Sequence, residues 1–331
     1  MRAGPAPVRC RHRVRAVVIA AAVVTAPGAA PVPGERPEPD VPGGHVLVRV
    51  AAAPITPLDR LCATGTSYFG RPVVPYVPGV QGVGTAADGR AVWFATSAGM
   101  APGDGSMRAL AAVPEADVVA LPAGADPVPV AALGLSAVAA WCALTGTGRL
   151  ARGETVLVLG AGGVVGQAGV QLARLAGAGR VVAAARSAAA RERAVALGAD
   201  AVVALSPDDE PGPLAARFAA AAGGPVDLVL DPLYGVPAAA AARALGPGGR
   251  LVNLGGSAGE SSPLDSSTLR SRSLQVLGYT NNALTVEQRR DAVVHVVGEA
   301  VAGRLTVAHT RAPLGAVTEV WDAPGRVVLE V

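Results

Sequence analysis

Three glycines at intervals of three residues, Gly160, Gly163 and Gly166, have the type and spacing to bind phosphate. They follow a short apolar run at 156–159 and lead into a segment whose apolar residues recur at helical spacing. A helix that begins directly after a glycine turn presents unpaired backbone N–H groups and the positive end of its dipole, and both favour an anion. The sequence therefore predicts a diphosphate cradle here.

The predicted cradle also includes Val164 and Val165, and the second valine breaks the common order G-x-G-x-x-G. Gly160 and Gly162 would need a third glycine at position 165 to match it. In a chain with 42 glycines, an ordinary tight turn is the alternative interpretation. The order of strand, turn and helix around the glycines favours the nucleotide site.

The residues after the next apolar run indicate which nucleotide binds. About twenty residues beyond the glycines, an NAD-binding fold usually places an acidic residue on the ribose hydroxyls. This chain has Arg186, Ser187 and Arg191 in that region. Because a guanidinium makes paired, charge-assisted hydrogen bonds to phosphate oxygens, we expect NADP(H) rather than NAD(H). The alternative is that Arg186 is a solvated residue at a helix start.

Composition excludes several kinds of chemistry and partner. All 28 basic residues are arginine, so neither a Walker-type phosphate lysine nor a Schiff-base lysine is available. The net charge of +3 is small for 331 residues, and we expect no nucleic-acid partner. The three cysteines form no C-x-x-C pair, which suits a reducing cytoplasm.

Residues 1–31 allow two interpretations. Five arginines, an apolar run at 16–24 and a small-residue stretch have the layout of a secretory signal, although the run is too short to span a bilayer. The alternative is a basic extension at 1–14 followed by a first strand at 15–19. We favour the second interpretation because nothing else in the chain suits export, and we expect a cytoplasmic protein without a membrane partner.

The pattern of apolar runs predicts an α/β protein with two parts. Short runs bounded by glycine and proline, including 73–77, 80–85, 91–96, 107–113 and 117–121, indicate a β-rich domain. From about residue 127 strands alternate with helices, and six strands with helical crossovers make a Rossmann doubly wound parallel sheet. We expect those strands at 156–159, 181–185, 201–204, 226–230, 251–254 and 274–277. A helix at 286–301 and a last strand at 326–331 follow, and that strand is expected to return to the β-rich domain.

The order of these motifs resembles the medium-chain dehydrogenase/reductase superfamily. The matching stretches are Ala-Ala-Trp-Cys-Ala-Leu at 139–144, the glycine turn from Gly153, Ala-Leu-Gly-Ala-Asp at 196–200 and Gly-Pro-Gly-Gly-Arg-Leu-Val at 246–252. The resemblance covers nearly the whole chain from residue 15. It implies a GroES-like catalytic domain at 15–124 and 282–331, a Rossmann NADP(H)-binding domain at 125–281, and an active site in the cleft between them.

Within that superfamily, the positions of the zinc ligands decide the chemistry. Zinc-dependent alcohol dehydrogenases carry a ligating cysteine where this chain has Thr56, and a Gly-His-Glu signature where it has Gly79, Val80 and Gln81. Neither threonine nor valine ligates zinc at such sites, and the four cysteines of the structural zinc lobe are missing from the sequence. We therefore expect no metal.

The remaining motifs resemble the zinc-free quinone oxidoreductase and enoyl reductase branch. Residues 75–84 resemble its P-x-x-P-G-x-x-x-x-G, and 65–70 resemble the region in which its enoyl reductases hold a proton-donating tyrosine. The resemblance implies that a buried Tyr68 donates a proton or a hydrogen bond; the alternative is that it only packs under the nicotinamide. The branch usually has Asn-Pro-x-Asp where Thr56 to Asp59 stands, so Asp59 matches and the asparagine is replaced by threonine.

Further contacts are expected at the carboxyl ends of the later strands. Asp231, and the pair Gly255 and Gly256, follow strands where ligands approach a doubly wound sheet, unless they serve only as turn residues. Tyr279 and Asn281 follow the sixth strand and are expected to contact nicotinamide or substrate, or to lie at a dimer edge. The family often pairs sixth strands across a homodimer.

These features leave three functional hypotheses. The first is an NADPH-dependent reductase that transfers hydride to a small-molecule quinone or α,β-unsaturated carbonyl without a metal. The second is a biosynthetic tailoring enoyl reductase that acts on a polyketide-like intermediate. The third is a catalytically weak, NADPH-binding protein that senses nucleotide or associates with RNA through the basic arm.

Overall fold

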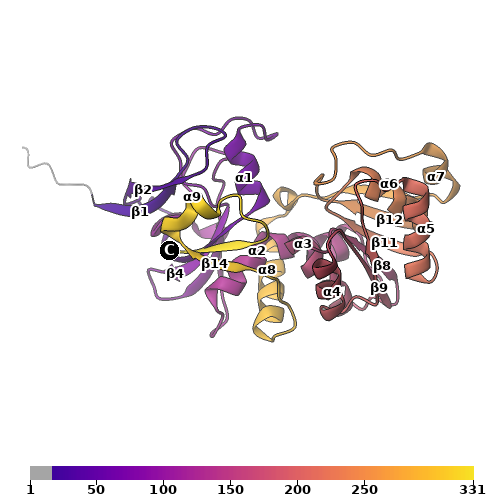
Figure 1. The fold of residues 1–331 in the computed structure, drawn as a ribbon. Helices are drawn as coiled ribbons and strands as arrows, with labels where there is room; N and C mark the ends of the chain where they lie inside the picture. Colours follow the sequence, from indigo (N-terminus) through magenta and orange to yellow (C-terminus); the bar gives the residue numbers. More distant parts are fainter. Residues whose placement is uncertain (1–16) are drawn as a thin grey trace, which may run out of the picture.

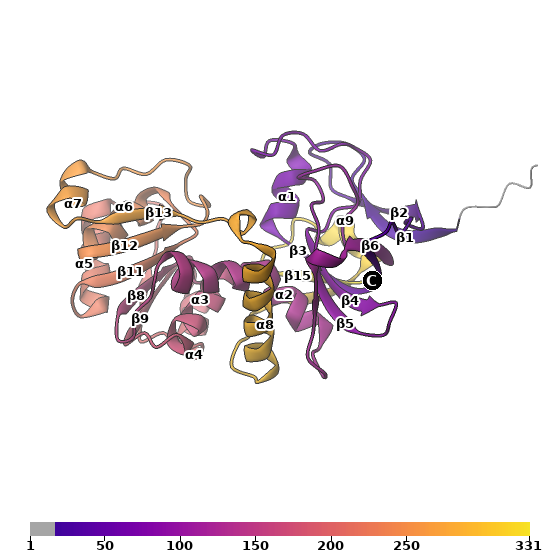
Figure 2. The ribbon, with the colours of Figure 1, turned by 180° about the vertical axis from the view of Figure 1, so that it is seen from behind.

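The chain forms two domains side by side, with helices between them (Figures 1 and 2). The structure is a computed structural model and describes residues 17–331. The basic extension expected at 1–14 and the charged part of the signal-like segment lie outside the described residues. Of the first strand expected at 15–19, the last two residues belong to strand β1 (Val18–Val23).

A six-stranded parallel sheet forms the core of one domain. It consists of β8 (Thr155–Leu159), β9 (Arg180–Ala185), β10 (Ala201–Ala204), β11 (Val226–Asp231), β12 (Leu245–Asn253) and β13 (Gln275–Gly278). Their order is β10-β9-β8-β11-β12-β13, and all five neighbouring pairs are parallel. This confirms the predicted doubly wound sheet, whose order reverses between β8 and β11.

Helices cover both faces of this sheet, which explains why its strands are continuous apolar runs. They are α3 (Val164–Leu175), α4 (Ala188–Ala196), α5 (Pro211–Ala222), α6 (Gly235–Ala244) and α7 (Ser266–Ser271). Val156 and Val158 pack in one cluster with α3 and α4, whereas Leu157 and Leu159 pack in another with α5 and α6. Alternate residues of one strand therefore serve opposite layers.

A mixed, mainly antiparallel sheet forms the other domain. Its strands are β3 (His45–Ile55), β4 (Gln81–Ala86), β5 (Ala91–Ala95), β6 (Leu110–Pro114), β7 (Val118–Ala120), β14 (Thr310–Pro313) and β15 (Val327–Glu330). The order is β14-β15-β3-β4-β5-β7, and β6 pairs with β3. β15 lies antiparallel to β3, which confirms that the last strand returns to this domain. β1 forms a hairpin with β2 (Val32–Pro37).

The strand expected at 73–77 is not formed. Only Tyr76 makes a bridge, to Val24, within this segment. Pro72, Pro75 and Pro78 have no N–H to donate to a ladder, so the apolar pattern here belongs to a loop. The short helices α1 (Pro57–Thr64) and α9 (Val317–Val320) complete the domain.

Two helices lie between the sheets. α2 (Pro127–Cys142), which continues as a π-turn η2 (Ala143–Thr147), packs against β3, β4 and α3, and against α8 (Val286–Val301). Residues 127–147 are long and apolar enough to cross a membrane by length and composition, yet two-thirds of the most apolar window is buried inside the protein (67%). We therefore interpret α2 as a core helix shared by both domains.

Candidate active site

The glycine turn after β8 has the geometry of an anion cradle. Gly163 is the N-cap of α3 and has no side chain, so the N–H groups of Val164, Val165 and Gly166 have no acceptor among residues 17–331. A β-carbon on Gly166 would overlap the carbonyl oxygen of Gly160 and lie 2.6 Å from the Cα of Ala161. The third glycine therefore permits the tight turn, and three free donors at a helix N-terminus fit a diphosphate.

The end of β9 presents arginines to the same edge of the sheet. Arg186 is exposed, and the Ser187 hydroxyl caps α4 by accepting a hydrogen bond from Ala190 N at 3.2 Å. Arg191 folds back so that Nη1 donates to the carbonyl oxygens of Ala185 (3.2 Å) and Arg186 (2.6 Å). Residues 185–191 include no acidic side chain. This arrangement fits a 2′-phosphate and offers no carboxylate to a ribose diol.

Asp231 lies at the carboxyl end of β11 but does not face the crevice. Its side chain is fully buried, with Oδ1 accepting from the N–H groups of Leu233 (2.9 Å) and Tyr234 (2.8 Å) and Oδ2 accepting from Asn253 Nδ2 (3.0 Å). Burial raises the pKa of Asp231, and these hydrogen bonds oppose the rise. The carboxylate thus fixes the loop after β11, and the expected contact with a cofactor stays a prediction.

Gly255 and Gly256 lie beside that loop. A β-carbon on Gly255 would be 3.0 Å from the carbonyl oxygen of Pro232, and the Gly255 carbonyl accepts from Asn253 Nδ2 at 2.9 Å. A β-carbon on Gly256 would be 3.0 Å from Glu260 Oε1. Both glycines thus allow two loops at the sheet edge to pack closely.

Tyr279 and Asn281, which follow β13, reach across to α2. The Tyr279 hydroxyl donates to Asn281 Oδ1 at 2.7 Å, and Asn281 Nδ2 donates to the carbonyl oxygen of Leu135 at 3.0 Å. Burial raises the pKa of Tyr279, to which Cys142 contributes. The polar groups of Tyr279 and Asn281 thus have hydrogen-bond partners within the chain, without a ligand or a second subunit.

Thr56 and Asp59 form a buried clamp at the start of α1. Thr56 N and Oγ1 donate to Asp59 Oδ2 at 2.8 and 2.6 Å, and the other carboxylate oxygen accepts from Gly79 N (3.0 Å) and Val80 N (2.9 Å). Burial raises the pKa of Asp59, while these bonds and the charge of Arg326 lower it. Both side chains are buried and hydrogen-bonded to protein groups, and their expected role toward a substrate stays a prediction.

The burial of Tyr68 differs most from what the sequence predicts. Its side chain is 78% exposed, on the loop after α1, and its ring lies 4.2 Å from that of Phe69. The buried phenol of this region is instead Tyr76, which is 3% exposed and whose hydroxyl has no hydrogen-bond partner among the described residues. The expectation that Tyr68 is buried is therefore wrong for this structure, because the loop carries it outward.

Four residues that were not predicted as site residues converge on α2: Gln81, Gly134, Ser136 and Arg326. Gly134 interrupts α2 with φ 36° and ψ −138°. Gln81 Oε1 accepts from Leu135 N at 2.7 Å, and Arg326 Nη2 donates to Ser136 Oγ at 2.7 Å. The signal that could have identified the place is a glycine within an otherwise apolar helix.

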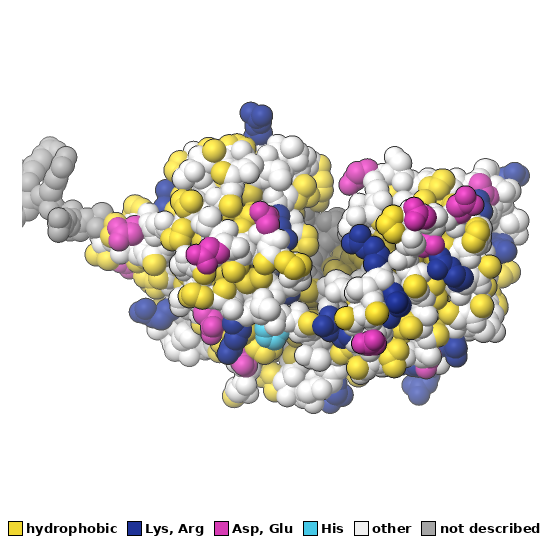
Figure 3. Space-filling view, in the orientation of Figure 1, with side chains coloured by type: hydrophobic (Ala, Val, Ile, Leu, Met, Phe, Trp, Pro, Cys, Tyr) yellow, Lys and Arg dark blue, Asp and Glu magenta, His cyan; other side chains and the backbone are white. Residues whose placement is uncertain are grey.

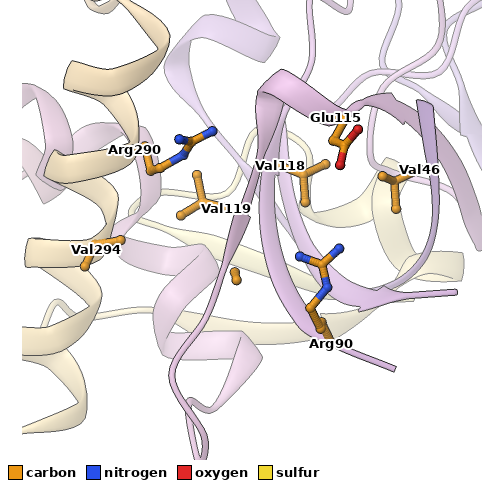
Figure 4. A pocket seen from close by; sticks show the side chains of 8 residues that line it. Val46, Arg90, Glu115, Val118, Val119, Arg290 and Val294 are labelled. Atoms are coloured by element: carbon orange, nitrogen blue, oxygen red, sulfur yellow. The ribbon is translucent and has the colours of Figure 1, made fainter. Parts of the chain in front are cut away.

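Two cavities lie away from the predicted site residues. The space-filling view shows the molecule hollowed between its two halves (Figure 3). A separate cavity of about 300 Å³ lies between β7 and α8, with Arg90, Glu115 and Arg290 among its lining residues (Figure 4). A smaller one of about 110 Å³ lies near Trp321. None of the predicted site residues lines either cavity.

The positions of the family's zinc ligands do not suit a metal. The Thr56 hydroxyl is hydrogen-bonded to Asp59, and Val80 has no donor atom in its side chain. In the part of the chain that the structure describes, no group of three or more His, Cys, Asp and Glu side chains is placed to hold a metal ion.

The fold and the cradle together define a two-domain protein with a candidate anion site at the carboxyl edge of a doubly wound sheet. Comparison with known proteins shows which of them the chain resembles. The sequence profile described as zinc-binding dehydrogenase matches residues 164–298. Human quinone oxidoreductase is 36% identical over 146 residues, which are 41% of this chain and 43% of that protein. A phenolphthiocerol/phthiocerol polyketide synthase of Mycobacterium tuberculosis is 31% identical over 226 residues, which are 64% of this chain.

The chain spans only 10% of that polyketide synthase. Among solved structures, the quinone oxidoreductase of Thermus thermophilus, also determined in complex with NADPH, has a TM-score of 0.77 at 29% identity and covers 94% of this chain and 100% of its own. A mycobacterial quinone oxidoreductase has a TM-score of 0.83 at 22% identity, over 95% of this chain and 100% of its own. The chain therefore has the two-domain fold of these solved oxidoreductases, and parts of its sequence are similar to quinone oxidoreductases and to a polyketide synthase.

Proposed function

We propose that the chain is a zinc-independent, NADPH-dependent reductase that transfers hydride to a quinone or to the C=C bond of an α,β-unsaturated carbonyl. One observation carries the choice of cofactor: the free N–H groups at the start of α3 lie on the same sheet edge as Arg186 and Arg191, with no acidic residue at 185–191. The quinone oxidoreductase of Thermus thermophilus, which was solved with NADPH, supports the same choice.

Each part of the cofactor has a matching group in this chain. The N–H groups of Val164, Val165 and Gly166 would hold the diphosphate, and Arg186 with Arg191 would hold the 2′-phosphate. When bound, NADPH supplies the hydride. Asp231 would act indirectly, by fixing the loop after β11 against which the cofactor lies.

Zinc independence rests on the residues at the ligand positions. Thr56 and Val80 do not fit the metal, so a substrate carbonyl would be polarised by hydrogen-bond donors rather than by a Lewis acid. We propose Tyr68 as the proton donor to the reduced substrate, because its loop also carries the Gly-x-Tyr-Gly-like segment of the branch. Its exposure in this structure leaves its hydroxyl accessible to a ligand.

A tailoring enoyl reductase is the second candidate. Its support is the 31% identity with part of a mycobacterial polyketide synthase, and a reducing polyketide synthase of Cochliobolus heterostrophus is 40% identical over 101 residues, 30% of this chain and 5% of that protein. A carrier-bound, polyketide-like enoyl substrate would then replace the free quinone. The third candidate is a catalytically weak NADPH-binding protein.

Steady-state oxidation of NADPH separates these candidates. The purified chain is offered small quinones, small enones and an enoyl thioester of an acyl carrier, while NADPH affinity is measured by fluorescence. Turnover with free quinones or enones supports the main proposal, and turnover confined to the carrier thioester supports the tailoring enzyme. Tight NADPH binding with no turnover on any of them favours the binding protein.

We further propose a cytoplasmic homodimer. β13 is an edge strand of the parallel sheet, and its Val276 is 41% exposed. Antiparallel pairing of two β13 strands would cover this edge. Light scattering coupled to size exclusion tests the pairing, which predicts that Val276→Arg produces a monomer; a dimer that survives this change would exclude the β13 interface.

A further inference from the structure

Ser136 is a hydroxyl that the fold exposes at one point of a buried helix. From Val130 to Ala140, every residue of α2 is buried except Leu135 and Ser136, which are half-buried. They follow directly after Gly134, where the helical backbone breaks. The two residues of this stretch that solvent reaches therefore lie directly after the break in the helix.

A buried guanidinium holds the Ser136 oxygen. Arg326 is 4% exposed; its Nη2 donates to Ser136 Oγ at 2.7 Å and its Nη1 donates to the carbonyl oxygen of Ile55 at 2.7 Å. Burial lowers the pKa of Arg326 to about 10, against the nearby charge of Asp59, so the side chain remains a cation at neutral pH. Positive charge thus lies behind the serine oxygen.

The Ser136 proton is left for a ligand. Among residues 17–331 the hydroxyl takes part in one hydrogen bond, as the acceptor from Arg326, and no acceptor receives its proton. Accepting a charge-assisted hydrogen bond polarises an O–H group and makes it a better donor. By contrast, the Thr56 hydroxyl gives its proton to Asp59.

The position of Ser136 relative to the sheet indicates which part of a ligand it would meet. The carbonyl oxygen of its neighbour Leu135 accepts from Asn281, which follows the carboxyl end of β13. Arg186 follows β9, on the other side of the strand-order reversal between β8 and β11. A dinucleotide spans that reversal, so a 2′-phosphate near Arg186 places the reactive ring on the half of the crevice nearer Ser136.

We infer that Ser136, positioned by Arg326, is a catalytic hydrogen-bond donor to the carbonyl oxygen of the substrate, in place of the donor that Thr56 does not provide. The inference rests on the proposed reductase activity. The hydride forms a C–H bond at the β-carbon, the electrons of the C=C bond move to form an enolate, and the charge that reaches oxygen is stabilised by the Ser136 O–H. The α-carbon then takes a proton from Tyr68 or water. Ser136 donates a hydrogen bond throughout and transfers no proton.

The test compares Ser136→Ala with Ser136→Thr, which keeps a hydroxyl. The first readout is the affinity of the NADP⁺-loaded protein for 4-nitrophenolate, a planar oxyanion that mimics the enolate. We expect Ser136→Ala to weaken binding about tenfold or more, as for loss of a hydrogen bond to a charged group, and Ser136→Thr to change it less than about threefold. The second readout is kcat with an enone, expected to fall about 10²-fold in Ser136→Ala at unchanged NADPH affinity.

The outcomes separate the two levels of the proposal. If the parent protein turns over enones and Ser136→Ala binds the phenolate and turns over equally well, the inference about Ser136 is wrong. A parent that does not bind the phenolate also overturns it. If no substrate supports NADPH oxidation but phenolate binding still depends on Ser136, the reductase proposal fails while the hydroxyl site stands. Unchanged NADPH affinity and thermal unfolding of Ser136→Ala show that the variant is folded.

Discussion

The side-chain amide of Gln81 occupies the space that a β-carbon on Gly134 would fill. Its Oε1 accepts from Leu135 N (2.7 Å) and from Trp93 Nε1 (3.2 Å), so two donors fix the orientation of the amide. The backbone of α2 is interrupted at Gly134, and the Gln81 amide packs into the interruption. Only glycine suits this position, because it tolerates the positive φ and leaves room for the amide. Gln81, the first residue of β4, therefore determines where α2 breaks.

Gly134→Ala is expected to destabilise the protein strongly. The alanine would carry a β-carbon at φ 36°, which costs about 1–2 kcal/mol, and would overlap Gln81, which costs about 1–3 kcal/mol. The free energy of unfolding, measured by urea denaturation, should fall by about 2–5 kcal/mol. Gly298→Ala is the control, since Gly298 is an exposed glycine inside α8 with nothing near its β-carbon position; it should stabilise by about 0.5–1 kcal/mol. Equal effects of the two changes would contradict the packing argument.

Arg186→Ala is expected to weaken NADPH binding about 10- to 100-fold, because a hydrogen bond to a charged group contributes about 1.5–3 kcal/mol. NADH has no 2′-phosphate, so its affinity should be unchanged. Fluorescence titration of both nucleotides measures the difference. Arg193→Ala, on the same helix α4, is the control and should leave both affinities within about twofold. A parent protein that binds NADH more tightly than NADPH would show that the assignment to NADP(H) is wrong.

Tyr68→Phe is expected to slow turnover about 10²-fold without changing NADPH affinity, since positioned proton donors contribute about 10² to 10⁴. Tyr76→Phe makes the same chemical change at a buried position and is the matched control. Because the Tyr76 hydroxyl has no partner among the described residues, its removal should leave turnover unchanged and should not lower stability. If Tyr76→Phe slowed turnover and Tyr68→Phe did not, Tyr68 would lose its assigned role.

The pair Glu154 and Arg250 should make stability depend on pH. Burial raises the pKa of Glu154. The two hydrogen bonds from Arg250, at 2.8 and 2.7 Å, the hydrogen bond from Ala151 N and the charge of Arg250 together outweigh burial, so the pKa lies below its ordinary value. A depressed carboxyl pKa contributes stability that is present above the unfolded value of about 4.3 and is lost as pH falls through the folded value. Glu154→Gln should therefore cost about 0.5–1 kcal/mol at pH 7 and progressively less below about pH 4.

Urea denaturation at a series of pH values measures this difference. Glu35→Gln removes an exposed carboxyl from β2 and is the control, for which we expect no such trend. A difference between the parent and Glu154→Gln that stays constant down to about pH 3 would show that the ion pair is not the source.

Local pattern was sufficient for most of the elements. The helix predicted at 286–301 has the bounds of α8, and the strands predicted at 156–159 and 201–204 lie within one residue of β8 and β10. These segments are either amphipathic or continuously apolar, so their periodicity follows from burial of one face or of both. The strand predicted at 73–77 was wrong because burial alone produced its apolar pattern. Apolar residues pack equally well in a loop, and the prolines here exclude a hydrogen-bonded ladder.

What the sequence by itself determined is the class of fold and the cradle, because a strand, a glycine turn and a helix are encoded within one short segment. It also predicted Thr56, Asp59, Asp231 and Asn281 as site residues. Only the tertiary structure decided what their polar atoms do: the carboxylates of Asp59 and Asp231 accept from backbone N–H groups, and Asn281 holds α2. The cluster of Gln81, Gly134, Ser136 and Arg326 could not be predicted from the sequence. Ser136 and Arg326 are 190 positions apart, and a hydrogen bond between them depends on tertiary packing and leaves no local periodicity.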